Sequence, residues 1–261
     1  MTALLELEGV TRDYGGLRAV DGVDLVVHAG ARHGLIGPNG AGKSTLFKLI
    51  RGGEAPTAGH VRFDGRDVTH VREHQRARMG IAQTFQASSL FLSLTCRENV
   101  LLALQRASGE TRRFARSRSR GVDADADRML GGVGLREKSG HGATTLSHGE
   151  RRQLEVAIAL ASSPRLLLLD EPTAGMSPAE TERLAAVLEA LDDELAVLIV
   201  EHDLDFVFRV ARDVSVLHLG AMLLSAPAAE VRTSDDVARV YMGGASMDDI
   251  FIDPDEAGAA R

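Results

Sequence analysis

One eight-residue segment constrains the fold of this chain more than any other. It reads Gly37-Pro38-Asn39-Gly40-Ala41-Gly42-Lys43-Ser44. It follows a predicted strand, Arg32–Ile36, and opens a predicted helix from Lys43 to about Ile50. Two glycines around four residues, followed by Lys and Ser, form the phosphate-loop pattern, in which backbone N–H groups and a helix N-terminus surround an anion. A simple turn would not need Lys, Ser44 and Thr45 at its exit.

The loop residues have distinct predicted roles. We expect Lys43 to reach the β- and γ-phosphates of a nucleotide, and the Ser44 hydroxyl to bind Mg²⁺. The backbone from Gly37 to Thr45 would surround the phosphates. The segment therefore predicts a site for a nucleotide with its metal.

A second segment supplies two carboxylates. Leu166–Leu169 is apolar throughout and is followed by Asp170 and Glu171. Such a run indicates a strand buried in a parallel sheet, and ligands bind at the carboxyl edge of these sheets. We expect Asp170 to hold Mg²⁺ through its water shell, and Glu171 to polarise the water that attacks the γ-phosphate. Acids that only ended the strand would explain one carboxylate better than two.

Apolar segments alternate with helical patterns along most of the chain, which favours a parallel sheet covered on both faces. Further strands are predicted at Leu4–Val10, Val23–Val27, His60–Asp64, Gly80–Thr84 and Ala196–Val200. Further helices are predicted at Arg97–Arg106, Asp125–Val133, Glu150–Ser162, Pro178–Leu191 and Leu204–Arg212. An Arg- and Ser-rich stretch between Gln105 and Asp125 is predicted to be a solvated loop, with contact to lipid headgroups or an acidic partner surface as the alternative.

Composition excludes several other classes of protein. No window approaches the roughly 18 apolar residues of a membrane-spanning helix, and Met1–Glu8 lacks the pattern of a secretory signal. The net charge of −7 gives no general attraction to nucleic acid. Cys96 is the single cysteine, which fits a reducing compartment. The sequence predicts a cytoplasmic protein without a nucleic-acid partner.

A third motif indicates a resemblance to a known protein family. Leu146-Ser147-His148-Gly149-Glu150 lies between the phosphate loop and the paired acids, and the combination resembles the ATP-binding-cassette (ABC) family with its signature loop. Ser147 is a suitable helix N-cap, with Glu150 in the position that completes a capping box. The resemblance implies that Ser147 and the N–H groups after it, including Gly149, grip the γ-phosphate of ATP bound by another subunit. It implies ATP and Mg²⁺ as ligands.

The same resemblance assigns three more residues. Tyr14 would stack on adenine, with a core or turn tyrosine as the alternative. Gln86 would touch Mg²⁺ or water and report the nucleotide state to a membrane partner, unless it is an exposed loop residue. His202 would act beside the γ-phosphate, unless it is a structural histidine at a strand end.

Two positions depart from the family pattern. His148 stands where glycine is more usual, and the loop can still work if this side chain points outward; otherwise the contact to the second subunit is put in doubt. Ser177 stands where many members carry an aspartate that couples the two nucleotide sites. The wording of the motifs, including Thr84-Phe85-Gln86, is similar to importers of branched-chain amino acids, related amides or urea.

The resemblance spans about Leu4 to Met242 and implies an α/β fold: a P-loop NTPase (RecA-like), mainly parallel sheet, with an N-terminal antiparallel β subdomain and a helical signature subdomain. The expected division is a nucleotide-binding core of residues 1–88 and 163–242, a helical subdomain of 89–162, and a tail of 243–261, in which Ile250–Ile252 are docking candidates. Implied partners are transmembrane permease subunits, a second ATP-binding subunit and an extracytoplasmic solute-binding protein. The expected location is the cytoplasmic face of the membrane.

Three alternatives remain open at this stage. One is the motor of a lipid or lipopolysaccharide exporter. Another is a cytoplasmic cassette protein that acts on ribosomes or DNA, although such proteins carry two cassettes or long coiled coils. The third is a nucleotide-sensing module without turnover, which loss of Glu171 or His202 would have favoured.

Overall fold

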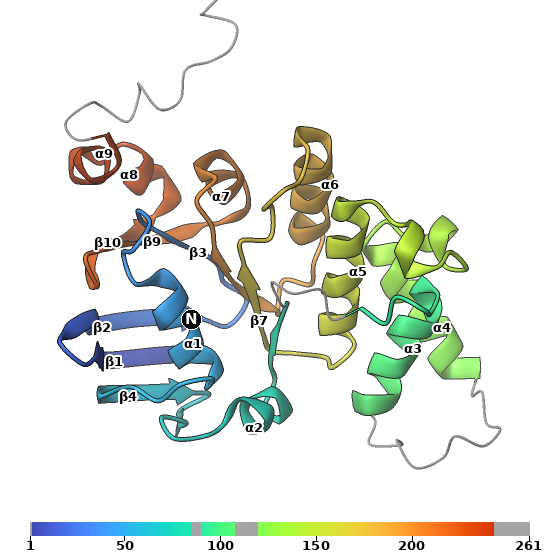
Figure 1. The fold of residues 1–261 in the computed structure, drawn as a ribbon, viewed down its shortest axis with the longest axis horizontal. Coiled ribbons are helices and arrows are strands. Elements are labelled where there is room, and N and C mark those ends of the chain that lie inside the picture. Colours follow the sequence, from blue (N-terminus) through green and yellow to red (C-terminus); the bar gives the residue numbers. More distant parts are fainter. Residues whose placement is uncertain (1, 85–89, 108–119, 243–261) are drawn as a thin grey trace, which may run out of the picture.

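The computed structural model describes residues 2–84, 90–107 and 120–242 and contains two sheets and several helices (Figure 1). The six-stranded sheet has the order β10-β9-β3-β8-β7-β6, and the four-stranded sheet has the order β2-β1-β4-β5. The strands are β1 (Ala3–Tyr14), β2 (Leu17–His28), β3 (Arg32–Ile36), β4 (Ala58–Phe63), β5 (Arg66–Asp67), β6 (Ile81–Gln83), β7 (Leu166–Asp170), β8 (Ala196–Val200), β9 (Asp213–His218) and β10 (Ala221–Pro227). The helices are α1 (Lys43–Arg51), α2 (Glu73–Arg78), α3 (Cys96–Ala107), α4 (Arg120–Gly132), α5 (His148–Leu160), α6 (Pro178–Glu189), α7 (Leu204–Val210), α8 (Ala228–Arg232) and α9 (Asp235–Met242).

The larger sheet is mainly parallel, as its apolar strands predicted. Strands β6, β7, β8, β3 and β9 pair in parallel, and only β10 is antiparallel to its neighbour. Every residue of β3 and β8 is buried. Strands buried on both faces are typical of a parallel sheet covered by helices, so the predicted fold class is confirmed.

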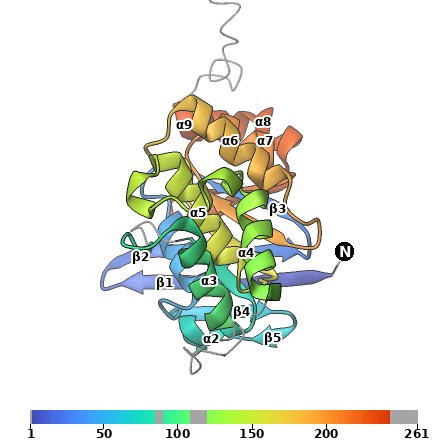
Figure 2. The same ribbon diagram turned by 90° about the vertical axis from the view of Figure 1, so that its right-hand side faces the viewer.

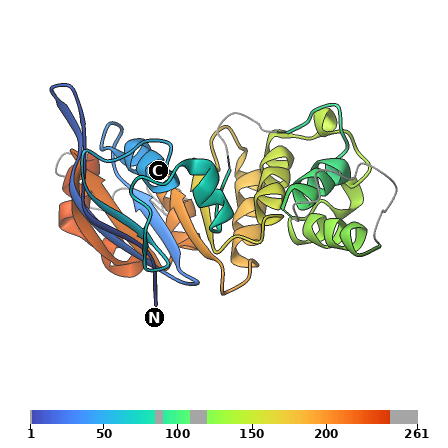
Figure 3. The ribbon, with the colours of Figure 1, turned by 90° about the horizontal axis from the view of Figure 1, so that it is seen from below.

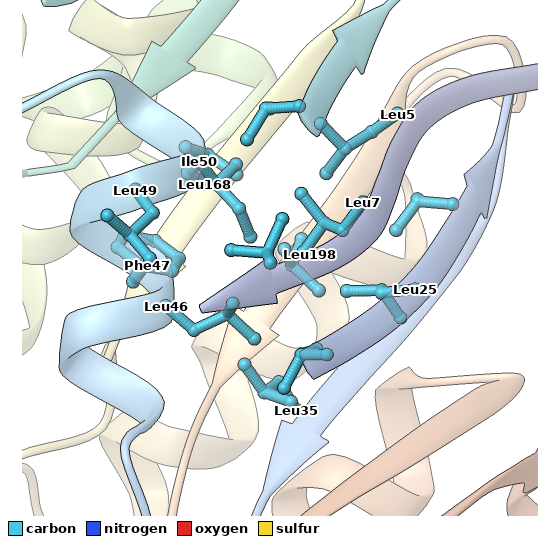
Figure 4. Packing of buried hydrophobic residues seen from close by; sticks show 14 of the residues in the cluster. Leu5, Leu7, Leu25, Leu35, Leu46, Phe47, Leu49, Ile50, Leu168 and Leu198 are labelled. Atoms are coloured by element: carbon cyan, nitrogen blue, oxygen red, sulfur yellow. The ribbon is translucent and has the colours of Figure 1, made fainter. Parts of the chain in front are cut away.

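Helix α1 is held by packing against side chains from both sheets (Figure 4). Its apolar residues share one buried cluster with side chains of β1, β2, β7 and β8; they are Leu46, Phe47, Leu49 and Ile50. Each fully buried side chain of this size contributes about 1.5–3 kcal/mol from its removal from water. The helix that follows the phosphate loop is therefore anchored along its length.

Helices α3, α4 and α5 gather at the end of the molecule opposite the four-stranded sheet (Figures 1 and 3). Seen from that end, α3 and α4 lie side by side in front of the sheets (Figure 2). Their buried residues share one cluster with Leu167 and Leu169 of β7. Cys96, at the start of α3, is buried in it without a disulfide. Throughout the described part of the chain, no helix has both the length and the apolar character to cross a membrane.

The structure corrects several predicted elements. The β1 and β2 strands are 12 residues each, much longer than predicted. Helix α3 runs to Ala107 and α4 begins at Arg120, so both ends of the predicted loop between Gln105 and Asp125 are helical and that prediction was wrong there. Residues 108–119 and Ile250–Ile252 lie outside the described residues. The hairpin of β9 and β10 and helices α2, α8 and α9 were not predicted.

A buried histidine makes the stability of this fold depend on pH. His33 on β3 is 4% exposed, its Nε2 lies 2.8 Å from Ser215 Oγ, and burial lowers the pKa of His33 to about 4. An unfolded histidine has a pKa of about 6.5, so the unfolded chain binds more protons between these values. The free energy of unfolding therefore falls as the pH decreases from about 6.5 to about 4, by up to about 3 kcal/mol from this residue.

From pH 7.5 to pH 4.5, the free energy of unfolding should fall by about 2–3 kcal/mol less in His33→Asn than in the wild type. Urea unfolding at the two pH values measures the difference. The control is His70→Asn, the same substitution at an exposed histidine. Equal pH dependence in the His33 variant and the wild type would contradict the account.

Candidate functional site

The phosphate loop leaves β3 at Gly37 and enters α1 at Lys43. Gly42 is the N-cap of α1 with φ of 102°, and a Cβ there would lie 2.4 Å from the carbonyl oxygen of Ala19. Only glycine fits this conformation and this approach. Leu46 N–H donates to Gly42 O at 2.9 Å, so the N–H groups that precede it in the first turn have no partner within the helix. These N–H groups are available to an anion, as the predicted cradle requires.

Lys43 is held inside this loop. Its Nζ donates to Gly37 O at 2.5 Å and to Pro38 O at 3.0 Å, and its side chain is buried. Burial lowers the pKa of Lys43, while the charges of Glu171, Asp170 and Glu201 oppose this effect. The ammonium group therefore lies near the carboxylates of two other strand ends.

Sheet register explains why these strand ends meet. Leu35 of β3 and Asp170 of β7 both pair with Val200 of β8. The residues after the three strands therefore leave the sheet at the same edge, where ligands of parallel sheets bind. This edge brings together the phosphate loop, Asp170 with Glu171, and His202.

Glu171 has a left-handed backbone conformation, with φ of 43°. Its N–H donates to Val200 O at 2.8 Å, so it remains tied to β8 after β7 has ended. A residue with a side chain in this region costs on the order of 1 kcal/mol or more and is enriched at functional sites. The turn sends the chain away from the sheet directly after the paired acids.

Asp170 fits the magnesium role predicted for it. Its Oδ1 is buried and has no hydrogen-bond partner among the described residues. Burial first, and then the charge of Glu171, raises the pKa of Asp170. A buried carboxylate oxygen without a donor is suited to a hard cation, for which oxygen ligands are preferred. Ser44, exposed in the first turn of α1, offers a hydroxyl oxygen.

A carboxylate that the sequence analysis missed joins two functional loops. Glu201 is fully buried after β8, and its Oε1 accepts hydrogen bonds from Thr173 N–H at 2.9 Å and from Thr173 Oγ1. Its Oε2 accepts from His202 N–H at 2.8 Å and lies 3.3 Å from His202 Nδ1. Glu201 thus fixes the loop after Glu171 to the loop of His202, whose side chain stays 60% exposed.

The signature loop has the predicted capped conformation. Ser147 is the N-cap of α5, its Oγ accepts from Glu150 N–H at 3.3 Å, and its own N–H donates to Glu150 Oε2 at 3.0 Å. His148 is exposed, and its Nε2 would lie 3.7 Å from a Cβ added at Gly175, in the loop that follows β7. Gly149 is buried, and a Cβ there would lie 2.8 Å from the side chain of Glu180.

The signature loop does not join the other site residues within one chain. Among the described residues, the hydrogen bonds of the Ser147 side chain and of Gly149 N–H go to Glu150 and Glu180, and none goes to the phosphate loop.

Tyr14 lies at the end of β1 and is 39% exposed. The guanidinium of Arg12 covers its ring at 4.6 Å, and its hydroxyl donates to Glu54. The ring is therefore held in place while much of its surface remains accessible, which suits the predicted stacking on adenine. Gln86 lies outside the described residues, so its role stays a prediction.

A phosphate loop between β3 and α1, with two acids at the end of β7 on the same sheet edge, defines a phosphate-loop ATPase. Comparison with known proteins gives the family. The family model "ABC transporter" matches residues 20–174, and the chain belongs to this family. It is an ATP-binding cassette, a subunit that hydrolyses ATP to drive a transporter.

Curated relatives cover almost the whole chain. A high-affinity branched-chain amino acid transport ATP-binding protein, BraF of Pseudomonas aeruginosa, is 37% identical over 252 residues, which are 93% of this chain and 98% of the relative. LivG of Escherichia coli, described in the same words, is 34% identical over the same shares.

Solved structures share the fold. The ADP conformation of MJ1267, an ATP-binding cassette of an ABC transporter, has a TM-score of 0.82 and 27% identity, and the match covers 93% of this chain and all of that one. A dimeric cassette, MJ0796 bound to ADP and Pi, has a TM-score of 0.72 and 26% identity over 86% of this chain and 99% of that one.

Proposed function

We propose that this cassette powers import of branched-chain amino acids, with related amides or urea as the other members of the cargo class. The observation that carries this proposal is the identity of 37% with BraF over nearly the full length of both proteins. No residue of the site described above touches cargo, because the site takes a nucleotide. The motifs and the relatives therefore support the cargo, while the geometry supports the motor.

We further propose that two copies, or one copy and a closely related cassette, enclose two ATP molecules. The dimeric MJ0796 structure supports this arrangement. Ser147 and Gly149 of one chain would then bind the γ-phosphate held by the phosphate loop of the other. Closure on ATP and opening after hydrolysis would move permease subunits attached at the cytoplasmic face of the membrane. The division into a core of 1–88 and 163–242, a helical subdomain of 89–162 and a tail of 243–261 belongs to this proposal.

Within each site, the chain's own residues bind and orient the reactants. Tyr14 stacks on adenine, and the loop N–H groups with Lys43 neutralise the phosphate oxygens. The carboxylate of Glu171 orients the attacking water and takes its proton, while His202 lies beside the γ-phosphate.

Mg²⁺ would be held by the Ser44 hydroxyl and Asp170, with Gln86 as a predicted further contact, and would offset charge on the transferred phosphoryl group.

Reconstitution tests the proposed cargo. We expect the chain to purify with permease subunits and the complex to hydrolyse ATP several-fold faster when a solute-binding protein loaded with leucine is added. The same binding protein without amino acid is the control. Stimulation by lipid or lipopolysaccharide alone would instead identify an exporter. Stimulation by urea would identify urea as the cargo in place of a branched-chain amino acid.

A further inference from the structure

One carboxylate of this chain occupies the donors of its own signature loop. Glu180 lies in the first turn of α6, next to the N-terminus of α5, and the two helices pack against each other (Figures 1 and 2). Glu180 Oε1 accepts from Ser147 Oγ–H at 2.7 Å and from Gly149 N–H at 3.1 Å. These two groups are the ones proposed to bind the γ-phosphate of a second copy.

The other oxygen of the same carboxylate faces α6. Glu180 Oε2 accepts from Ser177 N–H at 3.0 Å and from Ser177 Oγ–H at 2.9 Å. These four hydrogen bonds lower the pKa of Glu180 to about 2, so the group is ionised at neutral pH. The signature loop therefore already holds an anion within its own chain.

The two anions cannot both be accommodated. The Ser147 hydroxyl and the Gly149 amide each have one hydrogen, and both are directed at the same oxygen of Glu180. Carboxylate and phosphate oxygens accept hydrogen bonds, and their like charges repel at contact distance. A γ-phosphate that takes these donors has to break their hydrogen bonds to Glu180.

We propose that Glu180 is a positioning residue that occupies the phosphate donors of the signature loop in the separated chain, and that ATP held by a second copy of this chain displaces it on closure. This inference rests on the proposed contact of Ser147 and Gly149 with the partner's ATP. Glu180 keeps both donors oriented before closure. It also raises the ATP concentration that closure requires, because its charge-assisted hydrogen bonds are lost in the process.

The role of Ser177 follows from the same geometry. Its N–H and hydroxyl hold the second oxygen of Glu180, which leaves the first oxygen aimed at the signature loop. Ser177, the N-cap residue of α6, therefore holds the Glu180 carboxylate by two hydrogen bonds. Unlike the usual aspartate, it adds no negative charge beside that carboxylate.

Dimerisation at graded Mg-ATP tests the inference, in a Glu171→Gln background that binds ATP without turnover. Light scattering gives the ATP concentration for half-maximal dimer. We expect Glu180→Ala to lower this concentration about tenfold, since two charge-assisted hydrogen bonds no longer oppose closure. If Glu180 only holds α5 and α6 together, Glu180→Ala should raise the ATP concentration for half-maximal dimer, because loss of this contact would weaken the dimer. An equal or higher ATP requirement would overturn the proposal.

Two further variants keep the test decisive. Glu180→Gln retains the size of the side chain and removes its charge, and it should lower the ATP requirement by a smaller factor even if the alanine variant fails to fold. Ser177→Ala removes one contact to the far oxygen and leaves both signature-loop contacts, so we expect less than a twofold change. A Glu180→Gln variant that is folded and needs as much ATP as its parent, or more, would count against the proposal.

Ser147→Arg in the same background separates this inference from the proposed function. If Ser147→Arg dimerises like its parent, the signature loop does not bind the partner's ATP and both proposals fail. If Ser147→Arg abolishes dimerisation while Glu180→Ala leaves the ATP requirement unchanged, only the role of Glu180 is wrong.

Discussion

Glu171→Gln is expected to reduce ATP hydrolysis about 10³-fold while ATP binding stays within about threefold of the wild type. A positioned general base contributes roughly 10²–10⁴ to a rate, and the amide keeps the shape of the side chain but cannot take the proton of the attacking water. Among the described residues, Glu171 acts on Lys43 through its charge and makes no hydrogen bond to the phosphate loop, so Glu171→Gln should keep the hydrogen bonds of Lys43 to Gly37 O and Pro38 O. Phosphate release and equilibrium binding of ATP measure the two quantities.

A second carboxylate provides the control for this variant. Glu182 on α6 is exposed and pairs with Arg209, so Glu182→Gln changes the net charge by the same amount away from the site. We expect its turnover to remain within about twofold of the wild type. Turnover near that of the wild type in Glu171→Gln would remove the assigned role of Glu171.

Lys43→Ala is expected to weaken ATP binding itself, by about 10–100-fold. Charge-assisted hydrogen bonds to phosphate are worth about 1.5–3 kcal/mol, and the side chain is already held in the loop by Gly37 O and Pro38 O. The pKa of Lys43 is lowered by burial, so placing this cation in the loop has a desolvation cost that a bound anion offsets. Titration with a fluorescent ATP analogue measures the dissociation constant.

Lys48 is the matched control, because it lies on the same helix but is exposed. Its Nζ lies 3.7 Å from Glu54 Oε1, and its side chain is not held in the phosphate loop. Lys48→Ala should bind ATP within about twofold of the wild type. If Lys48→Ala and Lys43→Ala weakened binding equally, general charge rather than the loop geometry would explain the effect.

Local sequence patterns predicted the buried part of the fold well. The strands Arg32–Ile36 and Ala196–Val200 have the predicted limits, and every residue of both is buried. Only Ala196–Val200 is apolar throughout. The β9–β10 hairpin was missed, although Val214, Val216 and Leu217 are apolar and Gly220 marks the turn. Strand β10 alternates between exposed and half-buried residues, so it lacks the continuous apolar run of the central strands.

Sequence motifs also predicted the residues whose positions are fixed by their neighbours in the sequence. The Ser147 cap, the helix at Lys43 and the acids after β7 each follow from a short segment. Glu201 and Glu180 were missed because their partners are distant in the sequence: Thr173 is 28 residues from Glu201, and Ser147 is 33 residues from Glu180. Contacts of this kind depend on how loops meet at the sheet edge and on helix packing, which no spacing within a motif reveals.

The most direct test of the central proposal mixes two defective chains, both carrying Glu171→Gln. One also carries Lys43→Ala and keeps an intact signature loop, and the other carries Ser147→Arg and keeps an intact phosphate loop. Sedimentation with Mg-ATP should show little dimer for either chain alone. An equal mixture should form dimers that retain one ATP per two chains, at the single site built from both intact parts. A mixture that stays monomeric, or a Ser147→Arg chain that forms the ATP-bound dimer alone, would contradict a nucleotide site shared between two copies.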